Sequence, residues 1–231
     1  MAILASDIIA DAQAKSDMEF SEFVDDPRWL IWADQAVKEL HRVVCATFAA
    51  TYYRTTDFTL TGTTYTYALP ATFMRLKGLD VYPDTPMRRS VKRFNFAERN
   101  NSADYGTGWG GTWQEFARLR YNVIGSNILE LQPQEHCAFP YRLYWIPRPT
   151  ALVTTGTALD VELEPYWEYA STKAAIMALT KEESWDAVNV LKGQLAQMRA
   201  DMLEAVETDE GAPFSIIDEQ GQGGWGGGWD V

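Results

Sequence analysis

Four side chains of the types that bind transition metals occur in the chain, two histidines and two cysteines. His41 and Cys45 are four residues apart in a helical pattern, so both could face one ion from the same side of a helix. His136 and Cys137 are adjacent, and the chain would have to bend sharply for both to complete a tetrahedral zinc site. We therefore expect no metal and no cofactor, with Cys45 as a small core residue and His136 on the surface.

Carboxylate pairs are the next residues that could do chemistry, and they occur at Glu162 and Glu164 and at Glu182 and Glu183. General acid catalysis needs an apolar surrounding that raises one pKa, and neither pair has one, so solvated charge at helix ends is the simpler interpretation. The serines lack a nucleophile elbow, and the glycines between 106 and 111 follow no apolar strand. The sequence predicts a protein that is not an enzyme, and a hydrolase with an unrecognised site is a remaining alternative.

Four tryptophans lie in glycine-rich segments, Trp109 and Trp113 in the stretch 101–114 and Trp225 and Trp229 near the C-terminus. Exposed indoles can stack on sugars or on unpaired bases. A base-stacking site also needs arginine or lysine close by, and no basic residue follows residue 200. Binding of carbohydrate, or recognition of a cell surface, through these tryptophans is therefore the alternative function.

The segment 207–231 is predicted to be an extended docking tail. It has too little apolar area to fold alone, but it combines a short β-prone run with two indoles four residues apart. This combination suits addition of a strand to a partner's sheet, followed by anchoring of aromatic side chains. Each buried Trp contributes about 2–4 kcal/mol, against an ordering cost of about 1–2 kcal/mol per residue, so durable docking requires many copies. The predicted docking residues are Phe214, Ile216, Ile217, Trp225 and Trp229.

Charge is unevenly distributed along the chain, whose net charge is -12. Residues 1–26 hold seven acidic residues and one lysine, and residues 201–231 hold eight acidic residues and no basic one. Between 75 and 99 the balance reverses, with seven basic residues and three acidic ones. Acidic ends and a basic middle are self-complementary, so copies could associate head to side, although solvated faces would explain the same pattern. The net charge argues against a protein whose main function is to bind the phosphate backbone of a nucleic acid.

Helical periodicity marks both ends of the chain. A short helix is predicted over 6–15, and the clearest helix start is Asp-Pro at 26–27, where the aspartate can cap and the proline takes the first helical position. Two further helices are predicted over 164–180 and 184–206, and they should form a hairpin that packs on the Pro27 helix.

Between these helices the apolar residues repeat with a period of two, which indicates strands. We expect a hairpin over 58–67 around Gly62, then a strand over 74–83 with a bulge at Gly78. A second hairpin should turn at 125–127, and a further strand should end at the prolines after residue 146. These strands make a small antiparallel β-unit inserted between the helices.

The predicted fold class is α+β, a helical bundle from the N- and C-terminal helices with an inserted small antiparallel β-unit and an extended C-terminal tail. No apolar run approaches the roughly 20 residues of a membrane span, and the first residues are acidic where a signal peptide is basic, so the product is expected to stay in the compartment where it is made. The expected segments are the N-terminal helices at 1–50, the β-rich unit at 51–160, the helical hairpin at 161–206 and the tail at 207–231.

Several runs together resemble the head-to-tail adaptor (connector) proteins of tailed bacteriophages. The runs are DDPRWLIWADQAVKEL, FTLTGTTYTYALPATFMRLKGLDVYP, YWIPRPTAL and the long stretch from LDVELEPYWEY to QMRADML. The resemblance is one of order and pattern and covers roughly 25–203, including the Tyr-Xaa-Leu-Pro strand end at 67–70.

The resemblance implies a ring, usually of twelve copies, beneath the portal protein at the head-tail junction of the virion, with a channel through which DNA passes without specific binding. The C-terminal tail would reach the portal, and the β-unit would face neighbouring subunits or a downstream tail or nozzle protein. Trp109 and Trp113 belong to a loop that the resemblance does not cover and that could contact the tail side. The predicted contacts with a neighbouring subunit or the portal are Arg88, Arg89, Lys92 and Arg93.

Overall fold

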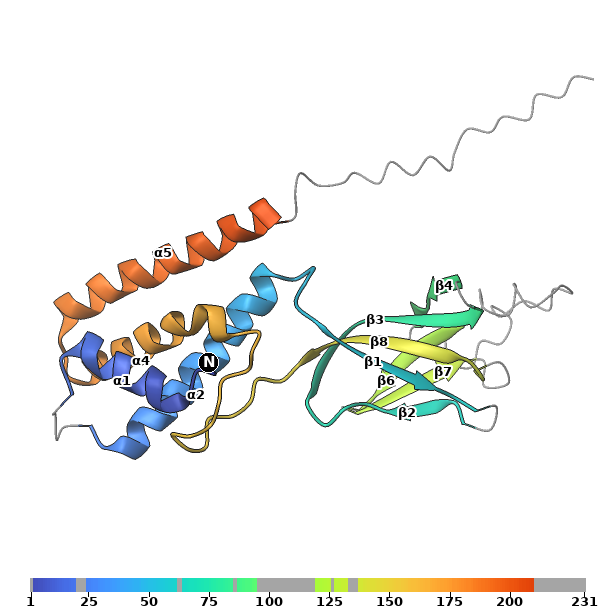
Figure 1. The fold of residues 1–231 in the computed structure, drawn as a ribbon, viewed down its shortest axis with the longest axis horizontal. Helices are drawn as coiled ribbons and strands as arrows, with labels where there is room; N and C mark the ends of the chain where they lie inside the picture. The colour runs from blue at the N-terminus through green and yellow to red at the C-terminus, as the bar shows by residue number, and fades with distance from the viewer. Residues whose placement is uncertain are drawn as a thin grey trace, which may run out of the picture.

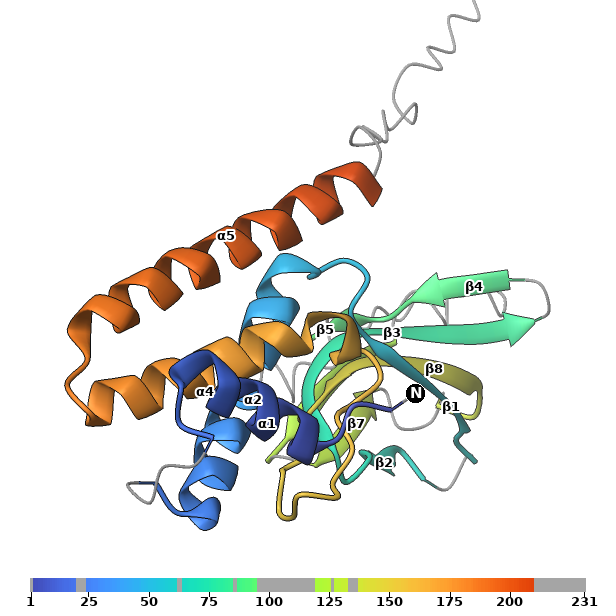
Figure 2. The same ribbon diagram turned by 60° about the vertical axis from the view of Figure 1, so that its left-hand side comes forward.

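A computed structural model describes seven stretches of the chain, and the helices and strands within them form two adjoining units (Figure 1). The described residues are 2–19, 24–61, 64–84, 87–94, 119–125, 127–132 and 137–209. The helices of the two chain ends form one unit and the intervening strands form the other, as Figure 2 shows from a second direction. The α+β class and the insertion of the strands between helices are therefore confirmed.

The helical unit is built around α4, which packs against the other helices. Its α-helices are α1 (Ala5–Ser16), α2 (Asp26–Thr47), α4 (Trp167–Lys181) and α5 (Trp185–Asp209), and the short 3-10 helix η4 (Glu164–Tyr166) leads into α4. Helix α4 buries four fully inaccessible alanines, so neighbouring backbones approach it closely. The predicted hairpin of the last two helices is confirmed, and it is α4 that makes most of the contact with α2.

Helix α2 begins one residue earlier than the sequence predicted. Asp25 takes the N-cap position, without a side-chain cap hydrogen bond, and Asp26 is already helical. Its buried side chains recur at helical spacing from Trp29 to Val44, which gives the expected core face. The expected start was therefore wrong by one residue, within the usual fraying of helix ends.

Within the described residues, the β-unit consists of two sheets of four strands each. The first has the order β1 (Arg54–Thr59), β8 (Pro140–Pro147), β3 (Phe73–Asp84) and β4 (Met87–Ser90). The second has the order β2 (Thr66–Ala68), β7 (Ile128–Gln132), β6 (Arg120–Ile124) and β5 (Lys92–Arg93). One apolar cluster is shared by both sheets, and its fully buried members include Val81, Leu129, Leu131 and Leu143.

The hairpin expected over 58–67 is wrong, because β1 and β2 belong to different sheets. Strand β1 pairs with β8, whereas β2 pairs with β7. Phe58 of β1 and Tyr67 of β2 stack face to face between the sheets, with ring centroids 3.9 Å apart. A period of two defines which side chains point inward but does not define which strand lies alongside.

The prediction of a purely antiparallel β-unit was also wrong in part. The described strands form two sheets, and the β5–β6 pair is parallel. Two local predictions are confirmed. The register of β3 on β8 shifts between Leu76 and Gly78, at the expected bulge. Strands β6 and β7 form the expected antiparallel hairpin, with Gly125 in the left-handed region at φ 62°.

Polar contacts join the two units where the chain passes between them. The Arg54 guanidinium at the start of β1 donates two hydrogen bonds to Glu162, at 2.8 and 2.9 Å. Lys77 of β3 donates to the carbonyl oxygens of Ala49 and Ala50, just past the C-terminal end of α2, where a cation is favourable. Charged side chains of each unit are therefore partnered by the other.

Candidate assembly surfaces

His41 and Cys45 pack together within the helical unit. His41 is 1% exposed, and the Cys45 sulfur lies 3.7 Å from its Nδ1 and 3.6 Å from its Nε2. Burial lowers the pKa of His41 and raises the pKa of Cys45 to about 11, so a neutral imidazole and a protonated thiol are the stable forms at neutral pH. The protonated thiol is a poor nucleophile and the imidazole is buried, so both side chains contribute to packing.

The second cysteine lies outside the core of the helical unit. Cys137 is buried in the β-unit, where burial raises the pKa of its thiol to about 12, and His136 lies outside the described residues. Among the residues that the structure describes, no three side chains of His, Cys, Asp or Glu gather in a way that could hold a metal ion.

The four carboxylates of the two predicted pairs lie in ion-pair or helix-end positions. The hydrogen bonds from Arg54 hold the pKa of Glu162 below its ordinary value, which is the opposite of what a general acid needs. Glu182 is the C-cap of α4 and Glu183 follows in the left-handed region, and both are exposed. These residues are ion-pair and helix-end charges.

A second charged cluster ties α5 to α2 and α4. Glu39 accepts hydrogen bonds from Tyr169 at 3.1 Å and from Arg199 at 2.9 Å, and Lys173 lies 2.8 Å away. Partial burial raises the pKa of Glu39, but the hydrogen bonds and charges of Lys173, Tyr169 and Arg199 outweigh it, so the pKa is lowered. The cluster holds α5 in place beside its apolar stripe, in which Val188, Leu191, Leu195 and Met202 are buried.

The predicted basic contact residues are divided between the two sheets. Arg88 on β4 lies 3.1 Å from Asp80 and donates to the Tyr144 hydroxyl at 3.3 Å. Arg93 on β5 donates to the side-chain oxygen of Asn122 at 3.2 Å. Arg89 and Lys92 are exposed. The segment therefore contributes positive charge to both sheets rather than to one patch.

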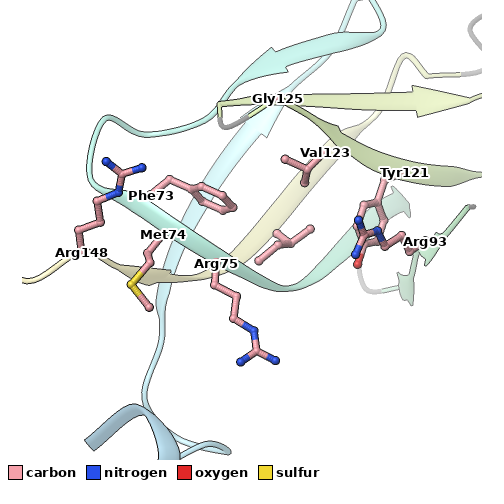
Figure 3. A pocket seen from close by; sticks show the side chains of 9 residues that line it. Phe73, Met74, Arg75, Arg93, Tyr121, Val123, Gly125 and Arg148 are labelled. Atoms are coloured by element: carbon pink, nitrogen blue, oxygen red, sulfur yellow. The ribbon is translucent and has the colours of Figure 1, made fainter. Parts of the chain in front are cut away.

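Arg93 also lines a pocket of about 370 Å³ that the sequence did not predict. The pocket lies between β3 of the first sheet and the β5 and β6 strands of the second. Arg148 reaches it from a distant part of the chain, because the backbone nitrogen of Arg148 donates to the Thr72 oxygen and so brings the end of β8 beside the start of β3. Figure 3 shows the Arg75 side chain pointing away from Phe73 and Val123. The residues that define its chemistry are Arg93, Arg148, Phe73, Tyr121 and Val123.

The predicted docking tail and the glycine-tryptophan loop lie outside the described residues. This applies to Trp109 and Trp113, and to the five tail residues Phe214, Ile216, Ile217, Trp225 and Trp229. Their roles remain predictions.

Comparison with known proteins defines the class of this chain as a phage adaptor. Residues 4–216 match the profile of the SU10 adaptor protein family, and the chain belongs to that family. No curated protein matches it. Membership implies a structural, non-enzymatic protein that binds other virion proteins. Among the described helices, none has the length and apolar character needed to cross a membrane.

Proposed function

We propose that this protein is a structural head-to-tail adaptor of a phage virion, forming a ring under the portal that extends the DNA channel and connects to downstream tail components. The observation that carries the proposal is the family match over residues 4–216, which includes both the helical unit and the β-unit. Twelve copies is the number we propose, from the resemblance to connector proteins.

The negative net charge of the chain suits the wall of a channel through which DNA passes. A net charge of -12 repels phosphates, so DNA can move through the channel without being held. The ring itself needs a heterologous contact, in which two different surfaces of the same chain meet. The opposed charges of the β-unit and the helical unit can supply such a pair of surfaces.

The tail is the part of the chain that we propose docks on the portal, through Phe214, Ile216, Ile217, Trp225 and Trp229. The described core residues of the helical unit lie between Ala5 and Met202, before the tail begins. Removing residues 211–231 should therefore leave the folded units intact.

The experiment is to mix the purified protein with the portal protein of the same phage and to measure native mass and particle symmetry. The full-length chain should form a ring on the portal, and the chain lacking 211–231 should keep its melting temperature but lose portal binding. Binding that survives the deletion would refute the docking role of the tail, and a full-length chain that stays monomeric with its portal would refute the adaptor ring.

The basic segment requires a more selective test than reversing all four charges. Arg88 pairs with the nearly buried Asp80, so its reversal would disturb the fold as well as any contact. Lys92 is exposed, and the K92E variant tests the proposed subunit or portal contact with less risk to the fold. Assembly with the portal should weaken, and unchanged assembly would show that Lys92 makes no such contact.

A further inference from the structure

A groove of about 200 Å³ lies between the start of α4 and the C-terminal half of α5, two helices that run side by side (Figures 1 and 2). Four apolar or aromatic side chains line it, Tyr166, Tyr169, Met198 and Met202. Glu168 and Asp201 also line it, and both are exposed. Sites for small molecules usually measure about 300–1,000 Å³, so this groove has the size for one long side chain rather than for a cofactor.

The two carboxylates of the groove have no cationic partner among the described residues. Asp201 accepts a hydrogen bond at 2.7 Å from the uncharged amide of Gln197, and within the described stretches the Glu168 carboxylate has no hydrogen bond or ion pair. Glu39 of the same unit, by contrast, has the Lys173 ammonium 2.8 Å away. Two unpaired carboxylates beside an apolar lining suit a cation on an apolar stem, because the head can pair while the methylenes pack.

Arg42 of α2 is a cation that fits this groove. It is exposed, and among the described residues its guanidinium has no hydrogen bond or ion pair. Lys38 on the same face is already paired with Asp34 at 2.5 Å, whereas Ala46, one turn after Arg42, is small and exposed and lets another surface approach. The chain beyond residue 200 cannot supply the cation, because it contains no lysine or arginine.

The groove and Arg42 lie on different outward faces of the helical unit. On α5, Arg199 bonds to Glu39 of α2, and Asp201, two residues further on, is turned by about 200° to the other side of the helix. On α2, Leu40 is fully buried, and Arg42, two residues further on, is likewise turned by about 200° away from it. Arg42 can therefore enter the groove of another copy but not that of its own. A contact between two different faces of one chain is heterologous and repeats in one direction, as a ring requires.

We propose that the acidic groove of each copy binds the Arg42 side chain of the next copy and that this contact helps to close the ring. The proposal rests on the ring of the proposed function and adds two surfaces that meet. The Arg42 guanidinium pairs with Glu168 and Asp201, and its stem packs on the methionines and tyrosines of the groove. The contact adds to the attraction between the β-unit and the helical unit of neighbouring copies, since both repeat in the same direction around the ring. It should weaken as salt rises, because charges are screened over about 8 Å at physiological ionic strength.

Charge reversal on each side of the contact tests the pairing. The E168K/D201K variant has a basic groove, and the R42E variant has an acidic face on α2. Each variant alone places like charges at every contact and should assemble at least about tenfold more weakly than the wild type at low salt. The chain R42E/E168K/D201K restores opposite charges at every contact and should recover assembly.

The E182K/E183K variant is the matched control. It changes the net charge by the same amount as E168K/D201K, but Glu182 and Glu183 connect the end of α4 to the start of α5, at the other end of the helix pair from the groove. It should assemble as the wild type does. An equal loss of assembly in the control would show that net charge matters and the groove does not, which would overturn the proposal.

The assay is native mass and particle imaging, with and without the portal, after circular dichroism has shown that each variant is folded. Assembly of R42E or of E168K/D201K at the wild-type level would overturn the proposal, and so would a folded R42E/E168K/D201K chain that fails to assemble. Loss of assembly in E168K/D201K but not in R42E would mean that the groove binds a cation of the portal and that the pairing with Arg42 is wrong. A wild-type chain that forms no ring with its portal would refute the adaptor ring itself, a result distinct from these.

Discussion

The ion pair between Arg54 and Glu162 should couple the stability of the two units. Two parallel hydrogen bonds at 2.8 and 2.9 Å join the start of β1 to the segment before α4, and Asp160 adds a third charge 3.8 Å from the guanidinium. Hydrogen bonds to charged groups contribute about 1.5–3 kcal/mol when shielded. The side chains are 39% and 36% exposed, so solvent screening reduces the expected coupling to about 1 kcal/mol.

The assay is a double-mutant cycle on R54M, E162Q and the combined variant, with urea unfolding of each chain. R54M retains the aliphatic stem and E162Q retains the shape, so the cycle isolates the charged pair. Each single variant should lower the free energy of unfolding by about 1 kcal/mol, and the double variant should cost little more than either. Two separated transitions in the single variants, in place of one, would show directly that the pair joins the units.

The pH dependence of this coupling has a defined sign. Arg54 holds the folded-state pKa of Glu162 below its ordinary value of 4.5, so the stabilisation is fully present above 4.5 and is lost as the pH falls through the lowered pKa. The coupling should therefore persist from pH 7 to pH 5 and decline toward pH 3. A coupling below about 0.3 kcal/mol at pH 7, which is within the usual additivity error, would refute the reasoning, as would one that does not change with acid.

Three substitutions test the packing of the separate units by thermal or urea unfolding. Thr172→Val should stabilise the protein by about 1 kcal/mol, because the buried Thr172 hydroxyl has no hydrogen-bond partner in the described part of the chain; a loss of stability would contradict this. Leu143→Ala should cost about 2–5 kcal/mol, since Leu143 is fully buried between the sheets; a cost under 1 kcal/mol would mean that the site collapses. Gly125→Ala should cost about 1 kcal/mol through its backbone at φ 62° alone, because no atom lies within 4 Å of an added Cβ; no cost would contradict that.

The helical unit was the part of the fold most accessible to sequence reasoning. Its helices carry local signals, such as the proline near the start of α2 and the repeated apolar positions that follow it. The central place of α4 was less visible, because a helix covered on most sides has no single apolar face. Its buried residues include Ser171 and Thr172 as well as alanines, and these small side chains give little periodic contrast.

The sheets and the pocket show where local patterns stop being informative. Alternation identified the strands, but the partner of β1 is β8, some eighty residues further along the chain, and no short-range signal specifies that pairing. The pocket likewise depends on Arg93 and Arg148, which are separated by a long stretch of sequence, and Arg93 belonged to the recognised basic run whereas Arg148 did not. The pairing of β3 with β8 brings Arg148 beside Thr72, at the start of β3.

Charge segregation also limits how copies of this chain can associate. A symmetric dimer that used both surfaces would pair the basic β-unit of each copy with the acidic helical unit of the other, leaving neither surface free for a further copy. A head-to-side contact pairs the same opposite charges once and leaves a free basic surface at one end and a free acidic surface at the other. Such a contact continues until the ring closes, and the closing angle, rather than the charges, determines how many copies it contains. Copy number should therefore depend on the relative orientation of the two units, which the Arg54–Glu162 pair helps to fix.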